Sequence, residues 1–361
     1  MACKNGHREI VKLLLDDKNS QNIDFNEKDS WGKTAFMLAC RLGHKDIAKL
    51  LLNHPRSQTS IDINAKDCYG TTTFMYASSM GCADVVKLLL DHPNGQNIDI
   101  NAEANSPSGY FALGWTGCTP FMTACARGHI DIVELLLDHP NSKNIDINHR
   151  SANYVCYCWY PRSKTSVWGR VCSLCCPMGG LGWTVFTTAC ARGHVDIVKI
   201  LLGHPRSQNI DINEKDSRGI TAFMLACRNR HKDIVKLLLN HPRSQTIDIN
   251  AKDCNGTTTF MFACSKGSPD VVKLLLDHPN GQNIDINAKC SLGWTTLMTA
   301  CSRGHIEVVK ILLDHPRSRN IDINAKDESG STALSLAKYF GFTDVVSLLQ
   351  YHQKRQHQDE A

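Results

Sequence analysis

The sequence predicts an all-α solenoid, in which stacked helix-turn-helix units are joined by β-hairpin-like fingers. One motif recurs about every 37 residues, a spacing found in helical repeat proteins. Each copy holds two short segments with apolar residues at helical spacing, separated in six of the nine copies by a Gly-His pair or its Arg-His variant. Seven copies then close with His-Pro and an alternating, turn-rich stretch. Nine alanines mark the copies: Ala2, Ala39, Ala77, Ala124, Ala189, Ala226, Ala263, Ala300 and Ala337.

Two of the eight intervals between these alanines are long. Six intervals measure 37 or 38 residues, and the third and fourth measure 47 and 65. The chain therefore carries insertions of about 10 and 28 residues inside an otherwise regular array.

The second copy shows what each segment should form. A first helix is expected from Thr34 through Cys40, whose apolar residues lie one, three or four positions apart. Gly43 breaks it, because glycine accepts the turn conformation that other residues resist. A second helix is expected from Asp46 through Leu52, and it ends at a His-Pro pair because proline cannot continue the helical hydrogen bonds. The alternating segment that follows predicts an extended finger.

A fixed frame of residues recurs in every copy and covers almost all of residues 1–352. It reads D-x-x-G-x-T…A-[AC]-x-x-G-H…[IV]-V-x-[LI]-L-L…[IV]-N-A-x-D, and this frame resembles the ankyrin repeat. The resemblance implies the ankyrin fold, a protein-binding role and finger asparagines of the kind that asparaginyl hydroxylases modify. The second copy matches the frame at Asp29, Gly32, Thr34, Ala39, Gly43, His44, Ile47, Leu51 and Asn64.

Two departures from the family pattern are visible. The family's Thr-Pro-Leu-His is Thr34-Ala35-Phe36-Met37 in the second copy. The period is 37 residues where about 33 is usual, and the extra residues follow the second helix. We expect the fold to accommodate both, with a longer outer loop.

The array is itself duplicated. Residues 85–102 and 271–288 are identical, and repeats 5–8 align with repeats 1–4. We expect repeats 1–4 in residues 1–148, with a truncated first repeat and a short insertion near residues 103–117. A Cys- and aromatic-rich insertion, expected to be disordered, follows in 149–181. Repeats 5–9 are expected in 182–352 and a polar tail in 353–361.

The two ends of the array differ. Lys338 replaces an apolar core residue in the ninth repeat, which is typical of a polar end cap. Met1 enters in the middle of the first repeat, which predicts an uncapped N-terminus and a fragment or truncated gene model.

Cysteine is abundant, with 17 residues. Seven of them share the position after the marker alanine and are expected to pack as small buried hydrophobes: Cys3, Cys40, Cys125, Cys190, Cys227, Cys264 and Cys301. The long insertion offers a separate group with pairs of soft ligands, as zinc sites do: Cys156, Cys158, Cys172 and Cys175, with His149 upstream. Zinc and a metal-free disordered insertion are the two readings, and we expect the second.

Thirteen of the 16 histidines form a Gly-His series of six and a His-Pro series of seven, and both are expected to serve turns and helix ends. The sequence holds no nucleophile elbow, phosphate loop, dinucleotide fingerprint or HExxH motif. We therefore expect a protein that is not an enzyme and needs no cofactor.

The composition limits the class of partner and the location that we expect. A formal charge of +5 over 361 residues is too weak to indicate a nucleic-acid or membrane partner. No apolar run reaches the roughly 20 residues of a membrane helix. Many thiols without a secretory signal favour a reduced cytoplasmic or nuclear location.

The expected function is a monomeric protein-binding scaffold or adaptor that uses a concave surface of fingers and inner helices. The alternatives are the ankyrin region of a larger channel, kinase or ubiquitin-ligase subunit and, less favoured, nucleic-acid binding. A basic row on the first helices either attracts an acidic protein surface or is an ordinary solvated face. The candidate binding residues vary between copies: Trp31, Arg41, Leu42, Tyr69, Met80, Arg127, Arg192, Arg218, Arg228, Asn229, Lys266, Trp294 and Arg303.

Overall fold

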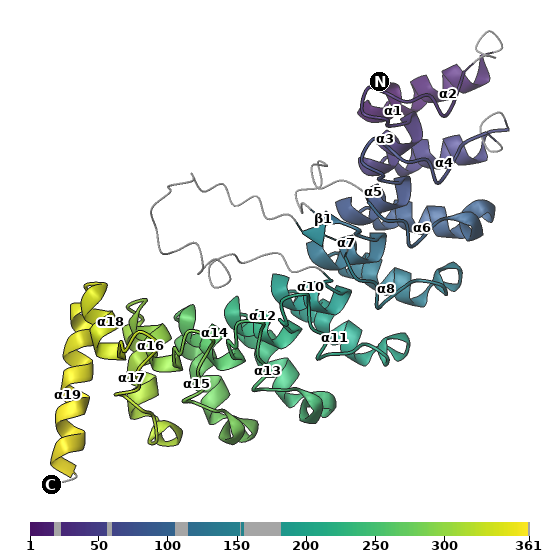
Figure 1. The fold of residues 1–361 in the computed structure, drawn as a ribbon. Coiled ribbons are helices and arrows are strands. Elements are labelled where there is room, and N and C mark those ends of the chain that lie inside the picture. The colour runs from purple at the N-terminus through teal and green to yellow at the C-terminus, as the bar shows by residue number, and fades with distance from the viewer. Residues whose placement is uncertain (18–22, 56–59, 105–114, 152, 155–181, 360–361) are drawn as a thin grey trace. The chain divides into compact units, whose positions relative to one another are not determined.

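The structure, a computed structural model, describes residues 1–17, 23–55, 60–104, 115–151, 153–154 and 182–359. Over these residues nine helix-turn-helix repeats follow one another, as predicted (Figure 1). The first helices are α1 (Ala2–Asn5), α3 (Ala35–Arg41), α5 (Thr73–Met80), α7 (Pro120–Arg127), α10 (Val185–Arg192), α12 (Ala222–Arg228), α14 (Thr259–Ser265), α16 (Thr296–Cys301) and α18 (Ala333–Tyr339). The second helices are α2 (Arg8–Asp16), α4 (Lys45–Asn53), α6 (Ala83–Asp91), α8 (Ile130–Asp138), α11 (Val195–Gly203), α13 (Lys232–Asn240), α15 (Pro269–Asp277), α17 (Ile306–Asp314) and α19 (Thr343–Asp359).

The chain divides into two compact units. The first comprises Met1–Tyr157, Leu181–Ala189 and Asp196–Ile210, and the second comprises Cys158–Gly180, Cys190–Val195 and Asp211–Ala361. In the first unit α1, α3, α5 and α7 pack in sequence, and α2, α4, α6 and α8 form a parallel layer. The second unit repeats this arrangement with α12, α14, α16 and α18 in one layer and α13, α15, α17 and α19 in the other. Each unit is therefore an all-α solenoid of two helical layers.

Threonine begins the first helices. The Thr34 hydroxyl accepts a hydrogen bond from the Met37 amide at 3.2 Å, and Thr72 caps Met75 in the same way. Such a cap satisfies a backbone donor that the helix leaves without a partner. The marker alanines of the inner repeats and the cysteines after them are buried: Ala39, Cys40, Ala226 and Cys227 are all 0% exposed. The predicted cysteine core is thus confirmed for these repeats. In the first repeat Cys3, expected to be buried, is partly exposed, because no repeat packs on its outer side.

The His-Pro pairs do more than end the second helices. Six of them begin a short 3-10 helix in the described residues, and the histidine caps it: the Asn94 amide donates to His92 Nδ1 at 3.2 Å, and the Arg317 amide to His315 Nδ1 at 3.2 Å. The histidine also ends the preceding helix, because the His92 amide donates to the Leu88 carbonyl at 3.1 Å. The extra residues of the long repeat form these elements: η2 (Pro93–Asn97), η3 (Pro140–Ser142), η5 (Pro205–Ser207), η6 (Pro242–Thr246), η7 (Pro279–Asn283) and η8 (Pro316–Ser318).

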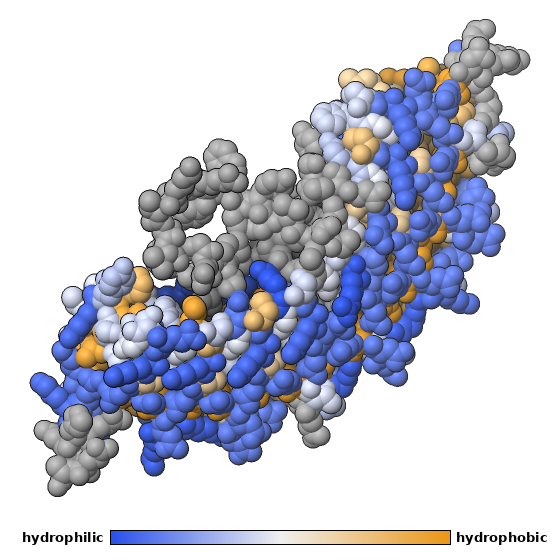
Figure 2. All heavy atoms as spheres, in the orientation of Figure 1, coloured by the Kyte–Doolittle hydropathy of each residue, from blue (hydrophilic) through white to orange (hydrophobic). Residues whose placement is uncertain are grey.

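The N-terminal repeat leaves apolar residues at the surface. Ile10 and Leu14 are 49% and 47% exposed, whereas their equivalents Ile47 and Leu51 in the second repeat are 2% and 4% exposed. Figure 2 shows hydrophobic residues at the surface of this end of the first unit. A preceding repeat is what covers this face elsewhere in the unit.

The C-terminal repeat differs in two ways. Lys338 is exposed at the position where other repeats bury cysteine, as expected of a cap. Residues 353–359, expected as a polar tail, continue α19 instead. Gln353 stands where the other repeats have proline after histidine, so nothing interrupts the helical hydrogen bonds.

Candidate functional site

The finger tips share one geometry. In the third repeat the Asp67 amide donates to the Thr71 carbonyl at 3.1 Å, while Asp67 Oδ1 accepts from the Tyr69 and Thr71 amides at 2.9 and 2.8 Å. Neighbouring fingers are joined, because the Cys68 amide donates to the Trp31 carbonyl at 3.1 Å. The backbone frame is therefore fixed, and the side chains at its tips differ from copy to copy.

Asparagines add a second link between fingers. Asn64 Nδ2 donates to the Asn97 carbonyl at 2.7 Å, and its Oδ1 accepts from the Asp99 amide at 2.9 Å. The hydroxylation that the family resemblance implies for these asparagines stays a prediction. Equivalent bonds are made by Asn26, Asn101, Asn213, Asn250 and Asn287.

Two candidate aromatic residues meet on the fingers of repeats 2 and 3. The rings of Trp31 and Tyr69 stack, with centroids 6.4 Å apart and an interplanar angle of 25°. Lys33 Nζ lies 5.6 Å from the centre of the Trp31 ring. Trp31 is 47% exposed, so the stack presents an aromatic surface to solvent.

A buried polar contact supports this stack from below. The Tyr76 hydroxyl donates to Asp67 Oδ2 at 2.6 Å, and Tyr76 is only 2% exposed. Burial, followed by the hydrogen bond to Asp67, raises the pKa of Tyr76 above its ordinary value. The Arg41 guanidinium lies 5.4 Å from the centre of the Tyr76 ring. We call Trp31, Lys33, Arg41, Tyr69 and Tyr76 the aromatic finger cluster.

The duplicated repeats 6 and 7 carry different residues at four of these five positions and keep arginine at the fifth. Arg228 lies over the Phe262 ring at 5.5 Å, which repeats the Arg41–Tyr76 contact without a hydroxyl. Arg218 and Asn255 replace the stacked Trp31 and Tyr69, and Ile220 replaces Lys33. The copy therefore keeps the frame of this surface and loses its aromatic tips.

The basic row that the sequence suggested is not one row. Arg41 and Arg228 lie two residues after the marker alanine, whereas Arg127, Arg192 and Arg303 lie three residues after it. One residue rotates a helical side chain by about 100°. Arg228 is consequently 1% exposed and packed against Phe262, so it is unavailable to a partner.

The remaining row lies at the ends of the first helices. Its members in the first unit include Leu42 and Met80, both 44% exposed, followed by the partly buried Arg127. Its members in the second unit are partly exposed and mostly basic: Arg192, Asn229, Lys266 and Arg303. Asn229 bonds the Ala191 carbonyl at 2.8 Å, so its amide supports the stack of repeats.

Trp294, another candidate, is partly exposed on the eighth repeat. It takes the position of Thr71 and Thr257, next to the helix cap Thr295. Its carbonyl accepts the Cys290 amide at 3.0 Å, so the finger closes in the usual way. Leu292, 43% exposed, lies at the tip of the same finger.

Both insertions begin and end inside finger tips. The Ala104 amide donates to the Cys118 carbonyl at 3.2 Å, and the Ser151 amide to the Trp183 carbonyl at 3.0 Å. These are the same closing bonds that join Asp67 and Thr71 in an uninterrupted finger. Two short strands, β1 (Trp115–Thr116) and β2 (Asn153–Tyr154), pair antiparallel where the two interrupted fingers run side by side.

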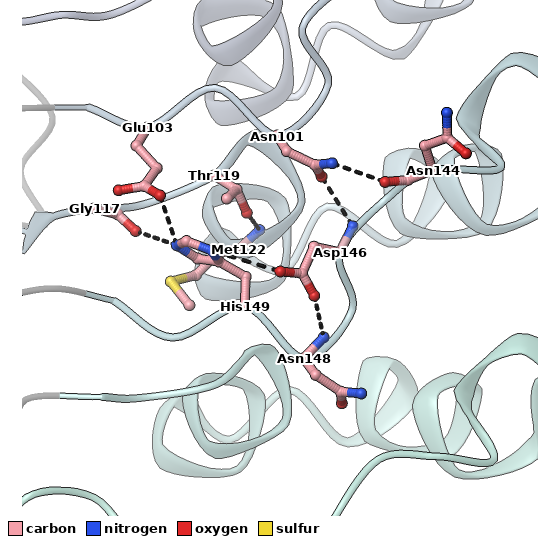
Figure 3. A network of polar contacts seen from close by, with 9 residues as sticks. All are labelled: Asn101, Glu103, Gly117, Thr119, Met122, Asn144, Asp146, Asn148 and His149. Atoms are coloured by element: carbon pink, nitrogen blue, oxygen red, sulfur yellow. Dashed lines mark hydrogen bonds and ion pairs between the residues drawn. The ribbon is translucent and has the colours of Figure 1, made fainter.

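His149 belongs to the finger frame at the base of the long insertion (Figure 3). Its Nε2 lies 2.8 Å from the Gly117 carbonyl and 3.8 Å from Glu103, and its Nδ1 lies 3.8 Å from Asp146. The expected boundary at residue 149 thus falls within an ordered finger. The four candidate zinc cysteines (Cys156, Cys158, Cys172 and Cys175) lie outside the described residues.

The Gly-His turns connect successive repeats. His129 Nε2 lies 2.9 Å from the Ser79 carbonyl, and His305 Nε2 lies 3.0 Å from the Ser265 carbonyl. The ring also fills the space beside the glycine of the previous repeat: a side chain on Gly81 would meet the His129 ring at 2.8 Å. These histidines therefore have the structural role that the sequence predicted.

The core thiols are poor nucleophiles. Burial raises the pKa of Cys301 to about 12 and raises those of Cys125, Cys190 and Cys227 further, so the reactive thiolate is scarce near neutral pH. Among the described residues no three His, Cys, Asp or Glu side chains are grouped closely enough to hold a metal ion. None of the helices described combines the length and apolarity that crossing a membrane requires.

Comparison with known families agrees with this architecture. A model of three consecutive ankyrin repeats matches residues 1–104, 170–253, 241–327 and 260–359, and a single-repeat model matches residues 116–151. A comparison with curated proteins gave no match. Since the matched segments cover most of the chain and coincide with its helical pairs, the chain belongs to the ankyrin-repeat family.

Proposed function

We propose that this chain is a non-catalytic protein-binding scaffold or adaptor, and that repeats 2 and 3 form its main contact surface. Ankyrin repeats bind other proteins through the surface that their stacking creates. The family alone does not choose a surface, so the choice depends on the residues that differ between copies.

The observation that carries the proposal is the exposed stack of Trp31 on Tyr69. Tryptophan and tyrosine are the residues that most often dominate binding energy at protein interfaces. A tryptophan left 47% exposed on a rigid finger can bury its outer face against a partner without a large loss of conformational freedom. Leu42 and Met80 add exposed apolar side chains on the first helices of the same two repeats.

The aromatic finger cluster also has the rigidity that such a surface needs. Tyr69 is held through its amide by Asp67, and Asp67 is in turn held by the Tyr76 hydroxyl. A pre-organised site avoids the entropic cost of ordering side chains on binding. The partly exposed Arg41 gives the cluster a positive character, which suits a partner with an acidic residue beside an apolar one.

The duplicated block supplies a matched control. Trp31→Arg with Tyr69→Asn introduces the residues that the copy carries at 218 and 255, so the finger backbone should remain intact. Partners recovered from native extract by wild type should be lost or strongly reduced with this double variant. Each such partner is then purified and titrated against both proteins by calorimetry. A partner that binds both forms equally, together with an unchanged set of recovered proteins, would refute the assignment.

The same proposal covers the wider setting. A scaffold of this kind would act in the cytoplasm or the nucleus, where its many thiols remain reduced. The alternative proposal is that the chain is the ankyrin region of a longer channel, kinase or ubiquitin-ligase subunit and that the surface recruits that protein's partner. Nucleic-acid binding is less well supported, because the fingers intersperse carboxylates with the few exposed aromatic rings.

A further inference from the structure

Arg230 is exceptional in its backbone. Its φ is +66°, and it is the one non-glycine residue with positive φ in the described part of the chain. The equivalent position is glycine in the other repeats, for example Gly43 and Gly81 with φ of +74° and +75°. A side chain in this left-handed conformation is strained, because its Cβ approaches the following carbonyl oxygen. An unfavourable residue kept in a rigid frame points to a role beyond folding.

The next repeat makes room for this side chain. A side chain on Gly193 or Gly267 would meet the histidine ring of the following repeat at 2.6 or 2.4 Å. The repeat after Arg230 has Ser268 in place of that histidine. Ser268 therefore removes the ring that a side chain at this position would otherwise meet. The first block has Cys82 at the same place but keeps glycine at position 43.

Three cations gather where Arg230 projects. The Arg230 guanidinium donates to the Lys266 carbonyl, which places the arginine against the seventh repeat. Both Lys266 and Arg303 lie in the row at the ends of the first helices. All three charges act on His305. Burial is the largest cause that lowers its pKa, and the charges of Arg303, Arg230 and Lys266 lower it further, whereas the hydrogen bond to Ser265 raises it.

The nearby carboxylates are engaged with other lysines. Asp270 Oδ1 lies 3.2 Å from Lys232 Nζ, and Glu307 Oε1 lies 2.9 Å from Lys310 Nζ. Their charges are therefore partly compensated, and the positive field at His305 persists. We call Arg230, Lys266 and Arg303 the basic cluster.

The first block carries a different set at these positions. Gly43, Met80 and Arg127 occupy the places of Arg230, Lys266 and Arg303. Two of the three cations are thus specific to the second block. The same repeats that lose the aromatic tips gain this charge.

We propose that the basic cluster on repeats 6 to 8 is a second binding site, which takes an Asp- or Glu-rich segment of a protein partner. Carboxylates along an extended chain can approach guanidinium and ammonium groups in turn, and positive charge also steers such a segment to the site. A polypeptide suits the surface better than a nucleic acid, since the cluster offers no aromatic ring for base stacking. The site deepens the proposed protein-binding function and lies in the other unit from the aromatic finger cluster.

The test measures binding of fluorescein-labelled octaglutamate to the full chain by anisotropy at low salt. The double variant Arg230→Gly with Lys266→Met installs the residues of the first block, so the frame of the repeat is preserved. Removing two cations should weaken octaglutamate binding by about tenfold or more. Wild-type affinity should fall as salt rises. Trp31→Arg with Tyr69→Asn should leave it unchanged, so the fate of the other proposal does not affect this result.

A gain-of-binding variant and a titration complete the test. Gly43→Arg with Met80→Lys should raise octaglutamate affinity, provided that Cys82 Sγ, 3.3 Å from where the new side chain would begin, moves by a few tenths of an ångström. Saturating octaglutamate should raise the pKa of His305, measured by NMR. Equal affinity of the wild type and the Arg230→Gly/Lys266→Met variant would overturn the proposal. So would tighter binding of a labelled eight-nucleotide single strand than of octaglutamate.

Discussion

The hydroxyl of Tyr76 gives the sharpest test of how the aromatic finger cluster is held together. Tyr76→Phe removes the 2.6 Å hydrogen bond to Asp67 while keeping the ring under Arg41. Hydrogen bonds to charged groups contribute about 1.5–3 kcal/mol. We expect the lower end, since Asp67 Oδ1 keeps its bonds from the Tyr69 and Thr71 amides. The copy, with Phe262 opposite Asp253, shows that the frame tolerates the loss.

Urea unfolding followed by circular dichroism gives the free energy of unfolding, and hydrogen exchange read by mass spectrometry locates the change. A loss of about 1.5 kcal/mol corresponds to roughly a tenfold rise in opening of the structure, and it should be confined to peptides from repeats 2 and 3. The control is Phe262→Tyr, which adds a hydroxyl in the copy and should be neutral or stabilising. The hydrogen-bond reasoning fails if Tyr76→Phe costs under about 0.5 kcal/mol, or costs as much in an Asp67→Asn background.

The pH dependence has a definite sign. The pKa of Tyr76 is higher in the folded state than the ordinary value of about 10. Its contribution to stability is therefore complete below pH 10 and is lost as the pH rises toward the folded-state pKa. The difference in unfolding free energy between wild type and Tyr76→Phe should shrink above pH 10. A difference that stays constant from pH 8 to pH 11 would contradict this account.

Three further predictions concern other parts of the chain. The pKa of His305 is lowered in the fold, so its contribution to stability is present above about pH 6.5 and is lost as the pH falls. Arg230→Gly should raise the pKa of His305, measured by NMR titration. An unchanged pKa would show that the charge of Arg230 does not act on His305. Amides of α1 and α2 should exchange faster than those of α12 to α16, because Ile10, Leu13 and Leu14 are exposed; equal protection would contradict this. Iodoacetamide should label the exposed Cys68 and Cys254 and spare the buried Cys125 and Cys264 without denaturant; peptide mass shifts measure this, and early labelling of Cys125 would refute the burial argument.

The sequence predicted the repeated frame well. The marker alanines, the cysteines beside them and the Gly-His turns recur at a fixed spacing, and a solenoid places equal positions in equal surroundings. One residue of the duplicated frame then indicates the environment of all its equivalents. This is why burial of Cys40 and Cys227 followed from spacing alone.

The sequence was less informative where a shift of one position along a helix changes the direction in which a side chain points. Arg41 and Arg127 both follow the first-helix core, yet they differ by one position and face different neighbours. Counting from the marker alanine would have separated them. Arg230 is a related case, because a single letter in place of glycine does not show its cost, which appears only with the backbone angle of +66°.

The finger tips of this array are sites that accept insertions. Two residues, 68 and 69, lie between Asp67 and Gly70, whereas residues 105–116 and 152–181 occupy the same interval in the two interrupted fingers. The entropic cost of closing a loop grows only with the logarithm of its length. Closing the longer insertion, residues 152–181, therefore costs about 2–3 kcal/mol more than closing the two-residue turn. The backbone hydrogen bonds that close the finger are made by residues outside the insertion, so an inserted segment needs no further contacts to hold its ends. A foreign recognition loop placed between residues 254 and 255 should therefore be carried by the seventh repeat with its neighbours undisturbed.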